Sequence, residues 1–151
     1  MKKREVLILA KSFAAECIGF RVRVLSRVIT SIFDRVLQPF GLKLAQGNIL
    51  IMLVIHGPVS SSSIGRVLSM EKSTVSRNLK RMGKKGLVGI VNKSGTNKQV
   101  VMVTSKGRNL VATIHVAWKK AQKESSDLLG AEGVAAVYDL FERIRQNKIK
   151  D

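Results

Sequence analysis

Cationic side chains are concentrated in one segment of the chain, residues 64–108. This segment has eleven Lys and Arg residues and a single acid, Glu71, so it carries +10 of the formal net charge of +17 of the 151-residue chain. Such an excess of cations binds phosphate backbones, because each neutralised phosphate releases counterions. The same segment predicts two short helices and a β-hairpin, which fit a DNA major groove and the backbone beside it. Binding to double-stranded DNA is therefore the chemistry that these residues predict.

The second of these helices, expected at residues 71–85 and ended by Gly86, has the pattern of a helix that reads DNA. Val75, Leu79 and Met82 recur at helical spacing and form an inner apolar stripe. The polar and basic residues then fall on the outer face, where they meet the groove. We expect DNA contacts from Lys72, Ser73, Thr74, Ser76, Arg77, Lys80 and Arg81.

Two of these residues have side chains suited to base edges. Arginine pairs bidentately with guanine, and the threonine methyl group contacts the methyl group of thymine. We assign these roles to Arg77 and Thr74. Three further cations fit either phosphate contacts or simple solvation: Arg81, Lys84 and Lys85.

Two flanking pieces complete the predicted DNA-binding surface. Ser61, Ser62 and Ser63 begin the first short helix, where hydroxyl and backbone N–H groups cap the helix, bind phosphate, or do both. Strands at residues 87–91 and 99–104 form the hairpin, called the wing below, because Ser94-Gly95-Thr96-Asn97 is typical of a turn. We expect DNA contacts from the wing residues Lys93, Thr96, Asn97 and Lys98.

The composition narrows the class of protein. A hydrophobic content of 45% argues against disorder, and an aromatic content of 5% argues against a sheet that stacks RNA bases on rings. A single cysteine excludes an intramolecular disulfide and is typical of a reducing cytoplasm. The basic-apolar start of the chain is too short for a signal peptide, and no apolar run reaches the length of a membrane span. We expect a cytoplasmic protein without a membrane association.

Helices are predicted on both sides of the winged segment. Apolar residues recur at three- and four-residue spacing through residues 4–38, and residues 43–56 form a mostly apolar central helix. Two more helices are expected, one at 105–126 that Ser105 caps and one at 133–147. The sequence therefore predicts a mostly α fold with a small β-hairpin, an α+β winged helix-turn-helix in one compact domain. Residues 43–104 form the DNA-binding region. Residues 1–42 and 105–151 form helical regions that cover their apolar stripes in a homodimer.

The order of elements and the local sequence resemble the MarR family of bacterial transcription regulators, over about residues 24–123. The resemblance implies a homodimer with two winged lobes that bind a pseudo-palindromic operator. It further implies a repressor released by a small aromatic effector, and no cofactor. The residues that carry it are Pro39-Phe40-Gly41-Leu42, Gln46, His56-Gly57-Pro58, Ile64-Gly65, Lys72-Ser73-Thr74-Val75-Ser76-Arg77, Lys85-Gly86-Leu87-Val88 and Val103-Thr104-Ser105-Lys106-Gly107.

The wing departs from the family pattern, which has Asp-x-Arg near the tip. This chain has Gly95-Thr96-Asn97 at that place, with Lys93 and Lys98 as the remaining cations. A lysine lacks the planar fork of arginine, so we expect this wing to add affinity more than sequence reading. For an effector pocket, expected where the flanking helices meet the winged lobe, we assign Phe13, Phe20 and Arg27, with core packing as the other role of both phenylalanines.

Other classes of protein compete with a regulator. Cys17 is either a buried packing thiol or a redox sensor whose thiolate Arg21 stabilises. His56 and His115 have no neighbours at metal-ligand spacing, so we expect no metal site and no catalytic set. A nonspecific architectural DNA-binding protein fits the same charge, and a basic protein on a membrane surface is the remaining alternative.

Overall fold

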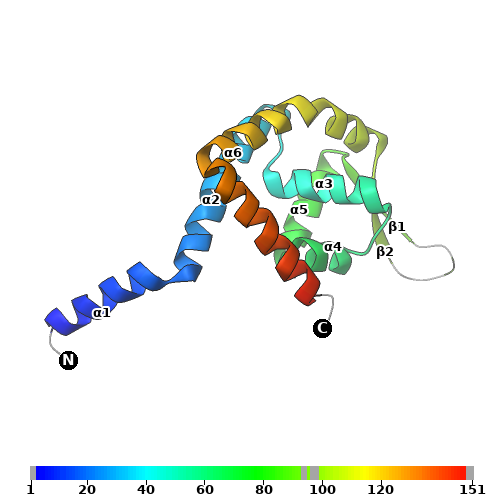
Figure 1. The fold of residues 1–151 in the computed structure, drawn as a ribbon. Coiled ribbons are helices and arrows are strands. Elements are labelled where there is room, and N and C mark those ends of the chain that lie inside the picture. The colour runs from blue at the N-terminus through cyan, green and yellow to red at the C-terminus, as the bar shows by residue number, and fades with distance from the viewer. Residues whose placement is uncertain (1–2, 93–94, 96–98, 149–151) are drawn as a thin grey trace.

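The computed structural model describes residues 3–92, 95 and 99–148 of the chain. It is mostly helical, with one two-stranded antiparallel sheet (Figure 1). The elements in chain order are α1 Lys3–Glu16, α2 Ile18–Leu37, the short 3-10 helix η1 Gln38–Phe40, α3 Leu44–His56, α4 Ser61–Leu68, α5 Lys72–Lys84, β1 Val88–Asn92, β2 Gln99–Val103 and α6 Ser105–Lys148. The predicted mostly α fold with a small hairpin is confirmed.

The main hydrophobic core lies in the lobe built from α3, α4, α5 and the sheet. Helix α3 is central, because Ile49, Leu50 and Leu53 are fully buried. Side chains from α4, α5 and both strands converge on it, together with the end of α2 and the first turns of α6. Burial of apolar surface is the main force that holds such a lobe together, so this lobe forms the rigid support for α5.

Local signals in the sequence set the turns of this lobe. The Ser60 hydroxyl caps α4 by accepting a hydrogen bond from the amide of Ser63 at 3.1 Å. Ser69 adopts a left-handed conformation, with φ of 51°, and turns the chain between α4 and α5. Gly86, with φ of 68°, follows α5 and leads into β1. A left-handed residue just after a helix is a common way to end it, and Gly86 was predicted for this position.

The sheet is short and is extended on one side by the chain before α4. Strands β1 and β2 pair from Val88↔Val103 to Asn92↔Gln99. Val59 exchanges two backbone hydrogen bonds with Val101, at 3.1 and 2.8 Å, and thereby ties the loop after α3 to β2. Because Val101 and Val103 are buried, the wing has a fixed base on the core.

A smaller second core joins α2 to α6. Ile32 and Phe33 of α2 and Ala121 of α6 are buried there, and the rings of Phe33 and Trp118 meet edge to face at a centroid distance of 5.0 Å. Arg35 also pairs with Glu124 across the two helices. These contacts fix the end of α2 and the middle of α6 on the winged lobe.

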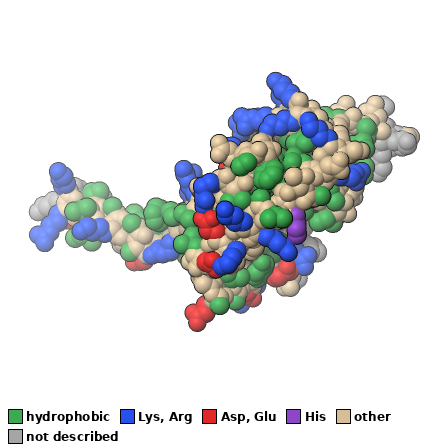
Figure 2. All heavy atoms as spheres, turned by 90° about the horizontal axis from the view of Figure 1, so that it is seen from above, with side chains coloured by type: hydrophobic (Ala, Val, Ile, Leu, Met, Phe, Trp, Pro, Cys, Tyr) green, Lys and Arg blue, Asp and Glu red, His purple; other side chains and the backbone are tan. Residues whose placement is uncertain are grey.

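The outer parts of the terminal helices lie apart from both cores. Helix α1 and the start of α2 form an arm that leads away from the body, and α6 crosses α2 and then turns back at Gly130 (Figure 1). Figure 2 shows hydrophobic and basic side chains along that arm. No buried side chain belongs to α1.

The structure revises one detail of the predicted helices. The two helices expected after the wing are present as the two arms of α6, which meet at a break at Gly130, where φ is 69° and ψ is 168°. The residue whose side chain caps α6 is Thr104, which accepts a hydrogen bond from the amide of Gly107 at 3.1 Å; we had expected Ser105. The cap falls one residue earlier because Ser105 already has helical geometry.

One bent pair of helices has the length and composition of a membrane span. Within residues 3–92, 95 and 99–148, no single helix is both long and apolar enough to cross a bilayer. The segments Ile18–Phe40 and Leu44–His56 reach that length and composition only together, with a bend of 76° between them.

Candidate nucleic-acid interface

Helix α5 presents one apolar face to the core and one polar face to solvent. Val75, Leu79 and Met82 are buried, as the spacing predicted. Of the residues expected to contact DNA from this helix, Thr74 is half-buried and the other six are exposed. Helix α5 is thus held on the lobe by its buried face. Its opposite face is exposed, and a DNA major groove is wide enough to admit an α-helix.

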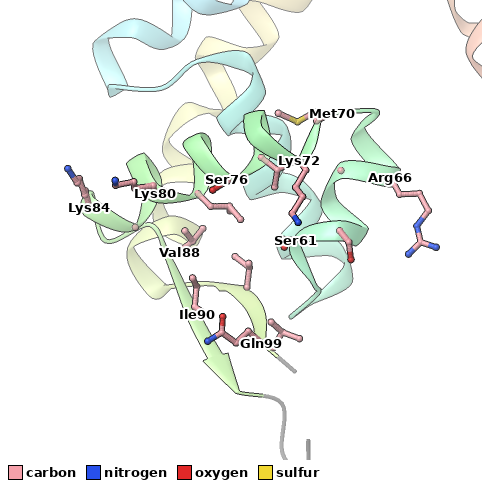
Figure 3. A pocket seen from close by; sticks show the side chains of 17 residues that line it. Ser61, Arg66, Met70, Lys72, Ser76, Lys80, Lys84, Val88, Ile90 and Gln99 are labelled. Carbon is pink, nitrogen blue, oxygen red and sulfur yellow. The ribbon is translucent and has the colours of Figure 1, made fainter. Parts of the chain in front are cut away.

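The polar face of α5 has two rows of side chains. Lys72, Ser76, Lys80 and Lys84 recur every four residues and line a cleft between α5, α4 and the sheet (Figure 3). Ser73, Arg77 and Arg81 form the neighbouring row, which does not line that cleft. Residues four apart lie on one side of a helix, so the rows are parallel and together hold five cations.

The cleft has an apolar floor and a basic rim. Its volume is about 840 Å³, and Val75, Leu79, Val88 and Val101 contribute to the floor. The rim includes lysines of α5 on one side and Arg66 of α4 on another (Figure 3). A basic rim at this position faces the phosphates of a duplex that receives α5 in its major groove, since phosphates flank each groove.

Two hydrogen bonds join Thr74 to other side chains of α5. The Arg77 guanidinium donates to the Thr74 hydroxyl at 3.2 Å, and the Asn78 amide donates to the Thr74 carbonyl at 3.0 Å. The Thr74 hydroxyl therefore accepts from Arg77. The two residues assigned to base edges lie side by side on the helix.

The serines at the start of α4 have two roles: some cap the helix and some are exposed in the cleft. The Ser60 hydroxyl holds the first turn, with contacts of 2.9 Å to the hydroxyls of Ser62 and Ser63. Ser61 and Ser62 are exposed and line the cleft, whereas Ser63 is half-buried. The positive end of a helix and its free N–H groups favour a phosphate at this place.

The structure separates the two lysines at the end of α5, which the sequence left undecided. Lys84 lines the cleft and is exposed. The Lys85 ammonium donates a hydrogen bond to the Gly41 carbonyl, in the turn after η1. Lys85 therefore ties α5 to the end of α2, and Lys84 belongs with the basic row.

The sequence analysis missed one residue of the basic rim. Arg66 lies on α4, where its guanidinium is 3.5 Å from the Ser63 hydroxyl, and it lines the cleft together with Ser62. The four-residue spacing from Ser62 to Arg66 is a signal that was available in the sequence. At the wing, Lys93, Thr96, Asn97 and Lys98 lie outside the described residues.

Cys17 is exposed, so the prediction of a buried packing thiol is wrong. It lies at the break between α1 and α2, where its Sγ accepts a hydrogen bond from the Phe20 amide at 3.3 Å. The Arg21 guanidinium donates to the carbonyl of Cys17 at 3.3 Å and to that of Ala15. The residue caps a helix because the chain breaks there, which helical periodicity across the break did not reveal.

The expected effector-pocket residues do not meet in a pocket of the single chain. Phe13 is 70% exposed and Phe20 is 58% exposed, so neither packs in a core. Arg27 is also exposed, and none of the three lines either cavity described for this chain. The helices that carry them project away from the lobe, which is the reason for the difference.

The histidines and acids do not form a metal site among the described residues, where no cluster of three or more potential ligands is present. His56 ends α3, as expected, and His115 is exposed on α6.

These features define a winged helix-turn-helix fold in which α5 has a basic outer face. A model of the MarR family matches residues 40–99. The uncharacterized HTH-type transcriptional regulator YwoH of Bacillus subtilis (strain 168) is 28% identical over 99 residues, which are 66% of this chain and 72% of YwoH. The winged segment of this chain is therefore similar to the MarR family, and the chain is similar to an HTH-type transcriptional regulator over 99 residues.

Solved structures agree with this fold. A mutant MarR from E. coli, complexed with operator DNA, has a TM-score of 0.76 and 19% identity, with 87% of this chain and 96% of that chain covered. Bordetella bronchiseptica BpsR, whose DNA binding 6-hydroxynicotinic acid regulates, has a TM-score of 0.76 and 20% identity, with 87% and 94% covered. At 20% identity or less, these structures show that the chain has the same fold.

Proposed function

We propose that this protein is a homodimeric, sequence-specific repressor that binds a pseudo-palindromic operator and is released by a small ligand. The observation that carries the proposal is helix α5, whose buried stripe fixes it on the lobe while two basic rows face solvent. One α5 from each protomer enters a major groove, and the two grooves lie about 34–36 Å apart on one face of the duplex.

The DNA contacts divide by chemistry. Arg77 and Thr74 contact base edges, and Lys72, Ser73, Ser76, Lys80 and Arg81 contribute to the same surface. Ser61, Ser62 and Ser63 bind phosphate at the start of α4, next to Arg66. The wing residues Lys93, Thr96, Asn97 and Lys98 contact the backbone or the minor groove beside it, where a narrow groove attracts cations.

The terminal helices support the homodimer. Among the described residues, twenty-three large hydrophobic side chains are exposed; eleven lie on α1 and α2, and six lie on α6 from Leu128 onward. Exposed apolar area of this extent marks an interaction surface, and a second copy of the chain offers the same surface in return. Residues 1–42 and 105–151 thus form the dimerisation region, and 43–104 the DNA-binding region.

Release by a ligand requires two dimer geometries with different affinities for DNA. A ligand shifts the equilibrium only as far as it binds one geometry more tightly than the other. The BpsR structure, with its regulation by 6-hydroxynicotinic acid, supports an effector of this kind for a protein of the same fold.

Fluorescence anisotropy with the DNA upstream of the protein's own gene tests the proposal, with a scrambled duplex of equal length as the control. We expect the upstream DNA to be preferred, and we expect the preference to remain when the salt concentration is raised. Equal binding to both duplexes that disappears with salt would refute sequence specificity. Sedimentation at micromolar concentration tests the homodimer, which a monomer would refute.

A nonspecific architectural protein is the second candidate, and the charge of +10 on residues 64–108 favours it. Such a protein binds every duplex with similar affinity and a steep salt dependence, because phosphate contacts carry no sequence information. The scrambled duplex in the anisotropy experiment separates the two candidates directly.

A further inference from the structure

The cleft beside α5 has an apolar floor that the proposed DNA contacts do not use. Its volume is about 840 Å³, against about 200 Å³ for the cavity between α2 and α6 where the buried Ser125 lies. Val88 and Ile90 of β1 face α5 across the cleft, and Ile90 is 63% exposed (Figure 3). The backbone of a duplex presents charged phosphates, and burying a charge against apolar side chains is costly. Exposed apolar surface of this kind marks an interaction with another partner.

The rim of the same cleft has cations without a counter-charge. Arg66 of α4 and Lys72, Lys80 and Lys84 of α5 line the cleft, and no Asp or Glu is among its described lining residues. All four cations are exposed, and none of them forms an ion pair with a described residue. The Lys72 side chain points into the hollow (Figure 3). A partner that has both carboxylates and apolar side chains therefore complements the rim and the floor together.

The spacing of the rim lysines fits a helical partner. Lys72, Lys80 and Lys84 follow one another at eight and four residues, which are about 12 and 6 Å along the axis of α5. Acidic residues four apart on a partner helix have the same spacing of about 6 Å, and apolar residues three and four apart form one face of that helix. An amphipathic helix that lies in an apolar groove is a recurring mode of peptide recognition.

We propose that this cleft binds an acidic amphipathic helix of another protein. The apolar face of that helix packs against Leu79, Val88 and Ile90, and its carboxylates pair with Lys72 and Lys80. The helix takes the side of α5 at which the phosphates of a duplex are expected, so the helix and DNA exclude each other. The exclusion of operator DNA rests on the proposed function, whereas binding of the acidic helix does not.

Synthetic peptides test the site in the absence of DNA. The probe is a fluorescent helical peptide with leucines on one face and glutamates elsewhere, and its anisotropy is measured with the full-length protein. A second peptide has glutamine for every glutamate. A third has alanine for every leucine, which preserves the helix propensity and reveals attraction to the net charge of +17 alone. We expect saturable binding of the first peptide and binding weaker by about tenfold or more for the other two.

Two pairs of variants test whether the peptide lies in the cleft. Ile90→Ser removes an apolar side chain of the lining, and Val91→Ser changes the next residue of β1, which does not line the cleft. Lys80→Gln removes a cation of the rim, and Arg81→Gln removes a cation outside it, so both variants have the same net charge. All four side chains are exposed, so their replacement leaves the core intact.

The variants of the lining should weaken the binding of the leucine–glutamate peptide, and their neighbours should not. We expect its affinity to fall by about tenfold in Ile90→Ser and by about fivefold in Lys80→Gln. In Val91→Ser and Arg81→Gln we expect a change of about twofold or less, because neither residue contacts the peptide.

Four results would overturn the site. These are no saturable binding of the first peptide, equal binding of the alanine peptide, equal losses in Ile90→Ser and Val91→Ser, or equal losses in Lys80→Gln and Arg81→Gln. Displacement of labelled operator DNA by the first peptide tests the exclusion, and a complex that holds both would overturn it. The peptide titrations contain no DNA, so they decide the site alone. The comparison of operator with scrambled duplex decides the proposed function, and either can fail while the other stands.

Discussion

The winged lobe and the terminal helices differ in how far they bury their apolar residues. In the lobe, the apolar side chains of α3 and α5 meet within one chain, and Leu50, Leu53 and Met82 are fully buried. On α1, the start of α2 and the end of α6, residues of the same types remain exposed, with Phe20 at 58% and Phe141 at 59%. The lobe buries its apolar residues within one chain, whereas the ends leave theirs exposed.

This contrast separates recognition from assembly. The lobe holds α5 on a core that a single chain provides, so the spacing of side chains along one recognition helix is fixed locally. In the proposed homodimer, the distance between the two α5 helices depends on the terminal helices. A signal that altered those helices would then change the distance between lobes without altering a lobe itself.

The largest expected effect follows from breaking the assembly surface. Phe141→Glu places a charge in the apolar surface of α6 and is expected to yield a monomer. Linking two DNA-binding modules raises affinity by about 10²–10⁴-fold, so operator binding should fall by a factor in that range. Sedimentation and anisotropy measure the two effects. The control is Ile55→Glu on α3, outside the proposed dimerisation region, a residue that is 69% exposed; a dimer in both variants would contradict the assignment.

A core substitution tests the other side of the comparison. Leu53→Ala removes a fully buried side chain of α3 and should lower the free energy of unfolding by about 2–5 kcal/mol. Val54→Ala, at the next position and 40% exposed, should lower it by about 0.5 kcal/mol or less. Urea denaturation at one fixed protein concentration compares them. Similar losses in the two variants would show that the lobe is not the stable unit.

Arg77→Ala tests whether the row of α5 that does not line the cleft contacts bases. The affinity for the operator should fall by about 1–3 kcal/mol, while the affinity for a scrambled duplex changes less. Arg143→Ala is the control, because Arg143 is paired with Asp139 on α6 at 2.8 Å, away from α5. A uniform loss on both duplexes would make Arg77 a phosphate contact.

The smallest effect separates two neighbouring lysines. Lys84→Gln should reduce the slope of log affinity against log salt by about 0.9, since one phosphate contact is lost, and should leave stability unchanged. Lys85→Gln removes the hydrogen bond to the Gly41 carbonyl and should lower the free energy of unfolding by about 0.5–1 kcal/mol. Salt titrations by anisotropy and urea denaturation measure both variants. Identical behaviour of the two would contradict the separate roles.

Much of the lobe was predictable from the sequence, because its signals are local. Val75, Leu79 and Met82 recur at helical spacing and are buried, and Gly86 ends α5 with the left-handed geometry expected of it. The strands were predicted within one residue of β1 and β2 at each end. Each of these features depends on neighbours within a few residues along the chain.

The errors fall where the outcome depends on distant residues or on a break in a helix. Cys17 lies on an apolar periodicity that runs through residues 13–36, yet the chain breaks at this residue and exposes it. Phe13 and Phe20 follow the same periodicity and remain exposed, because the arm leads away from the core. Periodicity identifies an apolar face, and it does not say whether the same chain covers that face.

The sequence by itself determined the basic winged segment, the inner and outer faces of α5 and the glycine that ends it, because charge and helical spacing are local properties. Only the tertiary structure decided that Lys85 holds the Gly41 carbonyl while Lys84 lines the cleft, and that Ser125 is buried beside α2. Those facts depend on contacts between residues that are many positions apart. Such contacts form only when the chain folds and buries some of its apolar faces against one another.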